Sequence, residues 1–214
     1  MSTQATPPSA ATIPGIPFPL TPSAGASWAV EGDPARVMVL AGAHTDIFVD
    51  PGGASQVNAE TLLNAATFLG TPPDGDFQFS ALVRVAFAST FDAGVLLLWF
   101  DEHQWAKLCF EYSPDREPMV VSVVNRGVAD DANAFVVPGA SIWLRISRLD
   151  STYAFHASDD GERWRLVRAF ALDAAGAPAR VGFEAQSPTG AGCAVSFNQI
   201  RFDSVRLADL RNGS

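Results

Sequence analysis

The stretch DFQFSALVRVAF, residues 76–87, decides the fold. Every second residue from Phe77 to Phe87 is apolar, and Gln78, Ser80, Leu82 and Arg84 fall between them. An alternation with a period of two is typical of a β-strand that buries one face in a core. We therefore expect a strand here, with its Phe77 side turned inward.

Similar strand-like runs precede and follow this stretch. They cover residues 35–42, 45–50, 93–101, 105–112, 119–127, 141–149, 152–158, 163–172, 179–186 and 193–202. Turn residues such as Asp, Gly and Pro separate the runs about every 8–12 residues, a spacing typical of antiparallel sandwiches and barrels. The sequence therefore predicts an all-β sandwich of two antiparallel sheets.

The ends of the chain differ from this pattern. Residues 1–25 contain six prolines and no charged residue, so we predict a proline-rich arm, a domain over 26–206 and a tail over 207–214. The apolar residues between Ile13 and Leu20 would allow part of the arm to lie against the domain. Residues 58–70 fit either a short helix capped by Asn58 or two short strands, and we favour strands.

Composition excludes several classes of function. The 214-residue chain carries a formal net charge of −9, which disfavours binding to nucleic acid or to an anionic membrane surface. No apolar run approaches the roughly 20 residues of a membrane helix, and no signal peptide is visible, so we expect a cytoplasmic protein. Cys109 and Cys193 lie in apolar runs and are predicted to be buried free thiols.

No cofactor or metal is expected either. The chain has no phosphate-binding loop or dinucleotide fingerprint, and its three histidines are isolated in the sequence. His44, Asp46 and Asp50 offer too few oxygens for calcium, which needs about six or more. The turns at Ser187–Gly192 and Asp159–Gly161 are interpreted as hairpin turns, in which glycine supplies the backbone freedom.

Several segments together resemble one known family. They are FDAGVLLLWFDEHQWAKLCFEYS (91–113), VVSVVNRGVADDAN (120–133), ASDDGERWRLVR (157–168) and VGFEAQSPTGAGCAVSF (181–197). Their order and character are similar to the uncharacterised family that includes the fungal regulation-of-enolase protein. The resemblance implies a concanavalin A-like jelly-roll sandwich, in a superfamily that holds lectins, glucanases and accessory domains of xylosidases. Where relatives carry an aromatic loop residue, this chain has Ala129-Asp130-Asp131-Ala132.

Polar and aromatic residues on the predicted strands suggest a ligand-binding groove on the concave sheet. The candidate hydrogen-bonding residues are Arg84, Lys107, Glu111, Ser122, Arg145, His156 and Glu184, with Trp99 or Trp105 as a stacking face. The alternative interpretation is a solvent-facing sheet with scattered ion pairs, each of which contributes little to stability.

Three functions remain open at this point. The first is a module that binds a saccharide or another small polar ligand in this groove. The second is a glycoside hydrolase with Glu111 and Glu184 as its carboxylate pair, although no two-carboxylate motif of a sandwich glucanase is present. The third is a regulatory domain that binds a protein partner, with an oligomer formed through exposed apolar surface as one form of it.

Overall fold

The protein is an all-β sandwich. The computed structural model describes residues 9–52, 60–173 and 176–214. These residues form two seven-stranded sheets and one two-stranded sheet, and every pairing that joins neighbouring strands is antiparallel. The predicted fold class is confirmed. No helix in the described ranges is long and apolar enough to span a membrane.

The first sheet carries the strands that position most of the candidate site. Its order is β1 (Thr21–Pro22), β6 (Ala66–Gly70), β15 (Arg180–Gln186), β8 (Ala93–Asp101), β9 (Gln104–Tyr112), β10 (Pro118–Arg126) and β11 (Ala129–Val136). Long apolar runs on β8, β9 and β10 are buried on both faces, because the core covers one side and a loop covers the other.

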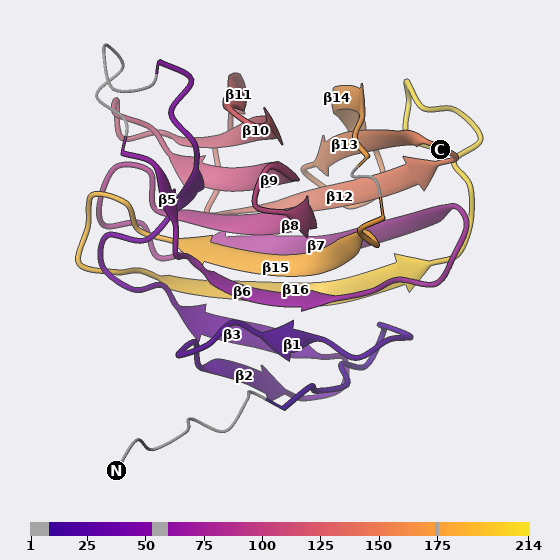
Figure 1. Cartoon of the computed structure of the whole chain (residues 1–214), viewed down its shortest axis with the longest axis horizontal. Coiled ribbons are helices and arrows are strands. Elements are labelled where there is room, and N and C mark those ends of the chain that lie inside the picture. The colour runs from indigo at the N-terminus through magenta and orange to yellow at the C-terminus, as the bar shows by residue number, and fades with distance from the viewer. Residues whose placement is uncertain (1–8, 53–59, 174–175) are drawn as a thin grey trace.

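The second sheet packs against the inner face of the first. Its order is β14 (Arg165–Ala171), β13 (Thr152–Ser158), β12 (Ser141–Leu149), β7 (Phe77–Val85), β16 (Ala194–Asp203), β3 (Arg36–Leu40) and β2 (Trp28–Glu31). In Figure 1, β1, β2 and β3 gather at one edge of the sandwich, and β11 and β14 lie at the opposite edge.

A short hairpin covers the outer face of the first sheet. Strand β4 (Ile47–Phe48) pairs with β5 (Leu62–Leu63), and Ile47 packs in a second apolar cluster with Leu97 and Trp105. Strands β5 and β6 confirm the strand interpretation of residues 60–70, whereas the predicted cap Asn58 lies outside the described residues.

The main core forms between the two sheets, as the alternation of residues 76–87 predicts. Phe77, Phe79, Ala81, Val83 and Val85 are all buried in it. Aromatic rings from both sheets also meet there, with centroids 4.5 Å apart for Phe183 of β15 and Phe197 of β16. Close aromatic pairs of this kind add to the stabilisation from apolar burial.

Part of the proline-rich segment also belongs to the sandwich. Ile13, Ile16, Phe18 and Leu20 are buried, and β1 pairs with β6. The two cysteines are free and buried, as predicted. The turn at Ser187 is held by structural bonds, because the Ser187 hydroxyl donates to the buried Asp92 carboxylate at 2.6 Å and accepts from the Gly192 N–H.

Candidate functional site

The nine predicted ligand-binding residues do not share one groove. Trp99, Trp105, Lys107, Glu111 and Glu184 alternate with the inter-sheet core on β8, β9 and β15, so they lie on the outer face of the first sheet. The others lie elsewhere. Arg84, Arg145 and His156 are on β7, β12 and β13, which belong to the second sheet, and Ser122 alternates with outward-facing Val121 and Val123.

This division has a simple physical cause. Alternation along a strand tells which residues share a face of that strand, but not which of two sheets the strand joins. The polar sides of β7 and β9 therefore look alike in the sequence although they face opposite sides of the sandwich. Ser122 is 2 % exposed and lies between the sheets, so it is not available to a ligand.

A buried charged cluster lies on the outer face of the first sheet, beneath the residues around β4. The Lys107 ammonium donates hydrogen bonds to Asp46 Oδ1 and to Gln186 Oε1, both at 2.8 Å. Burial alone would lower the pKa of Lys107, but the charge of Asp46, together with that of Glu184 when it is ionised, outweighs burial and raises that pKa. Lys107 is thus a fixed cation that ties the β4 segment to the sheet, and only 2 % of it is exposed.

Glu184 is the least satisfied member of this cluster. It is fully buried, and neither of its carboxyl oxygens has a hydrogen-bond partner among the described residues. Burial raises its pKa to about 8, although Lys107 acts in the opposite direction. Burial likewise raises the pKa of the half-buried Glu111 to about 8. Burial therefore favours the protonated form of both carboxyls.

These properties bear on the predicted hydrolase pair. Glu111 and Glu184 lie on β9 and β15 with β8 between them, and Glu111 aligns through Ala93 with Gln186 rather than with Glu184. A glycosidase pair needs one protonated and one ionised carboxyl on either side of an accessible bond. Here both carboxyls favour protonation, and both Glu184 oxygens are closed off from solvent. The two glutamates therefore do not have the arrangement and the protonation that a glycosidase pair requires.

The accessible part of this face is a pocket beside the charged cluster, which we term the Trp99 pocket. Its volume is about 290 Å³. It is lined by Thr21, Pro22, Ser23, Ile47, Leu63, Ala65, Thr67, Leu69, Trp99, Glu102 and Arg180. Thr67 is the cross-strand neighbour of Glu184, and Arg180 is that of Trp99. The pocket therefore brings together the indole of Trp99, the guanidinium of Arg180, the carboxylate of Glu102 and the hydroxyl of Thr67 at the edge of the charged cluster.

The two tryptophans differ in what they can do. Trp105 is fully buried and lies under Lys107, whose ammonium is 5.8 Å from the ring centroid. Trp99 is half-buried and lines the pocket. Trp99 can thus offer a face to a ligand, and Trp105 cannot.

On the second sheet, the C-terminal tail covers the predicted residues Arg145 and His156. Arg145 donates to the Gly213 carbonyl and stacks on Trp164 at 4.1 Å, and His156 Nε2 lies 2.8 Å from the Leu210 carbonyl. Burial, together with the charge of Arg145, lowers the pKa of His156 to about 4. His156 is thus neutral at pH 7 and donates to Leu210.

Sequence reasoning missed the pocket residues Thr67, Glu102 and Arg180 and the partners of Lys107. Asp46 stood out only as a weak calcium candidate, and it is instead the ion-pair partner of Lys107. In the described parts of the chain, no three His, Cys, Asp or Glu side chains come together in a way that could hold a metal ion. The signal for Gln186 was its place two residues after Glu184, on the same face of one strand.

Comparisons with solved structures support the fold. A functionally unknown protein from Saccharomyces cerevisiae matches with a TM-score of 0.70 and 20% identity, over 85% of this chain and 97% of that one. The GH43 protein BlXynB from Bacillus licheniformis matches with a TM-score of 0.66 and 14% identity, over 88% of this chain and 37% of that one.

A third solved structure also matches. It is a xylan beta-1,4-xylosidase from Bacillus halodurans C-125, with a TM-score of 0.60 and 12% identity, over 78% of this chain and 32% of that one. This chain thus spans about a third of each of these two GH43 or xylosidase chains, and at such low identity the likeness is one of fold.

Sequence comparison gives the family. No curated protein matches the chain. A family model described as "Protein of unknown function (DUF1349)" matches residues 25–205, which is nearly the whole sandwich. The chain therefore belongs to the DUF1349 family.

Proposed function

We propose that the protein binds a small polar ligand, a single sugar ring or a compact polyol, in the Trp99 pocket. The observation that carries this proposal is the half-buried Trp99 indole beside Arg180, Glu102 and Thr67 in one pocket. An indole face suits the apolar C–H face of a sugar ring, and the surrounding donors and acceptors suit its hydroxyl groups.

The size of the pocket supports a small ligand. Its volume of about 290 Å³ lies just below the usual range of roughly 300–1,000 Å³ for small-molecule sites, so one ring fits better than a long chain. The Lys107 cluster beneath the pocket does not contact the ligand but keeps one wall of the pocket in place. Lys107 holds Asp46 beside Ile47, and Ile47 forms one wall of the pocket.

A glycan array combined with a thermal-shift assay tests the proposal. Wild-type protein should bind at least one monosaccharide or terminal sugar unit and melt at a higher temperature in its presence. Trp99→Leu should lose this binding, because leucine offers no flat aromatic face. Phe91→Leu is the matched control, since Phe91 is an exposed aromatic residue that does not line the pocket.

Two results would count against the proposal. One is the absence of any saccharide or polyol that binds wild type. The other is equal binding by wild type and by Trp99→Leu, which would place any sugar site elsewhere on the molecule.

A further inference from the structure

The outer face of the second sheet carries a basic, partly apolar hollow that is separate from the Trp99 pocket. We propose that it is a second site, which binds a small carboxylate with an apolar body, such as a medium-chain or aromatic acid. The hollow lies over β2, β3, β16 and β7 and has a volume of about 570 Å³. A neighbouring hollow of about 440 Å³ shares Arg36 and Arg84 with it.

The two arginines are available to an anion. Both are exposed, and in the described residues neither guanidinium makes a hydrogen bond or an ion pair, even with Glu31, which aligns with Arg36 across β2 and β3. By contrast, Arg165, Arg168 and Arg206 each pair with an aspartate.

The surroundings keep this face basic although the whole chain is acidic, with a net charge of −9. Of the strands beneath the hollow, β3 and β7 contain no acidic residue and present Arg36 and Arg84 on the outer face, and the acidic residues of β2 and β16, Glu31 and Asp203, do not line the hollow. A local cationic field of this kind attracts anions even on a protein of opposite net charge.

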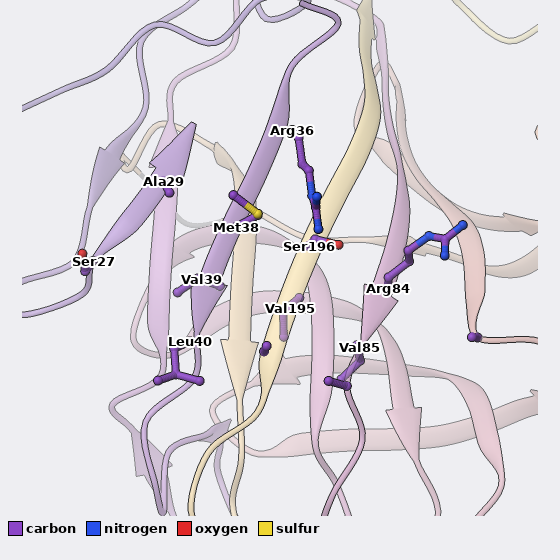
Figure 2. A pocket seen from close by; sticks show the side chains of 13 residues that line it. Ser27, Ala29, Arg36, Met38, Val39, Leu40, Arg84, Val85, Val195 and Ser196 are labelled. Carbon is purple, nitrogen blue, oxygen red and sulfur yellow. The ribbon is translucent and has the colours of Figure 1, made fainter. Parts of the chain in front are cut away.

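Ser196 lies at the centre of the proposed binding position for the carboxylate. It aligns with Met38 on one neighbouring strand and with Arg84 on the other. Figure 2 shows Arg36 and Arg84 on either side of Ser196, with the Arg36 side chain extending toward it and the Arg84 guanidinium turned away. Because Arg84 is exposed and has no partner among the described residues, its flexible stem allows it to turn back over Ser196.

The hydrogen-bond roles at Ser196 also favour an anion. The Asn198 amide donates to Ser196 Oγ at 3.3 Å, so the serine hydroxyl keeps its own hydrogen for an acceptor. A carboxylate accepts from such a hydroxyl and from guanidinium groups, whose forked donors match its two oxygens.

The remaining lining explains why the ligand should have an apolar part. Met38 and Leu40 supply the apolar surface of the larger hollow, because Met38 is half-buried and Leu40 is 72 % exposed, whereas Val39, Val85 and Val195 lie at its floor and pack in the main core. In Figure 2 the side chain of Met38 lies beside Ser196, and that of Leu40 lies further along β3. An alkyl or aryl group laid over them would remove this apolar surface from water.

Titration calorimetry with octanoate and benzoate tests the assignment, with hexanol and inorganic phosphate as comparison probes at fixed ionic strength. We expect saturable binding of the carboxylates and much weaker binding of the alcohol and of phosphate. Arg84→Met and Arg36→Met should each weaken octanoate binding by about tenfold or more, as loss of a charge-assisted hydrogen bond does. Arg84→Lys should fall between wild type and Arg84→Met, because it keeps the charge and loses the fork.

Arg163→Met serves as the matched control, since Arg163 is exposed and lies outside both hollows. Three outcomes would overturn the inference: no saturable carboxylate binding, the same affinity in Arg36→Met and Arg84→Met as in wild type, or phosphate binding as tight as octanoate binding. Melting curves of each variant without ligand show whether a loss of binding reflects a loss of folding.

Discussion

At the scale of single residues, Glu184 links the charged cluster to the pH dependence of stability. Its pKa of about 8 in the folded protein exceeds its usual value of 4.5, so between these values the folded state binds more protons than the unfolded state. The free energy of unfolding should therefore fall as pH rises through this window, by about 1 kcal/mol per pH unit for one group whose pKa is raised this far. Glu111 acts in the same direction.

The prediction is cleanest between pH 6.5 and 8. Below pH 6.5, His156 has the opposite effect, because its folded pKa of about 4 lies below the usual 6.5. Urea unfolding in the upper window should show a decline in wild type that is roughly halved in Glu184→Gln. The exposed Glu162→Gln should keep the wild-type slope. An unchanged slope in Glu184→Gln would mean that this carboxyl is not held in its protonated form.

At the scale of elements, the C-terminal tail is bound to the second sheet through a small number of specific contacts. Gly213 accepts from Arg145 and has a φ of +73°, and a Cβ at this position would lie 2.6 Å from the Cβ of Trp164. Beneath the tail, Arg145 Nε, Ser147 Oγ and His156 Nδ1 are buried without a partner among the described residues. The docked tail is thus sensitive to a single added methyl group.

We expect Gly213→Ala to loosen the tail without unfolding the sandwich. Hydrogen exchange over residues 207–213 should rise about fivefold or more, which corresponds to a loss of more than about 1 kcal/mol of local stability. Gly176→Ala is the control, because Gly176 also has a positive φ of 85° but, in the part of the chain that the structure describes, an added Cβ would meet no atom within 4 Å. If tail exchange in Gly213→Ala were no faster than in Gly176→Ala, the close approach of Gly213 to Trp164 would not be what holds the tail in place.

At the scale of the whole molecule, the two proposed sites lie on opposite outer faces, with the main core between them. They share no lining residue, so substitutions in one should leave binding at the other unchanged. Octanoate affinity in Trp99→Leu therefore provides a check that this variant is intact.

At this scale, the fold could be predicted from the sequence, but the arrangement of the candidate site could not. Alternation and turn residues were enough for the strands and the sandwich, because both follow from local patterns along the chain. They could not tell that Arg145 and Lys107 belong to different sheets, which depends on strand order. Nor could they reveal that Asp46, 61 positions away in the chain, meets Lys107, since that contact depends on how a loop lies over the sheet.

The most direct test of the account is to follow the indole N–H signals of the tryptophans by ¹⁵N NMR while monosaccharides are added, with Trp99 assigned from the spectrum of Trp99→Phe. We expect one sugar to move the Trp99 signal in a saturable way and to leave the buried Trp105 signal in place. If every sugar leaves the Trp99 signal unmoved, or if one binds while only other tryptophans respond, the Trp99 pocket is not a saccharide site.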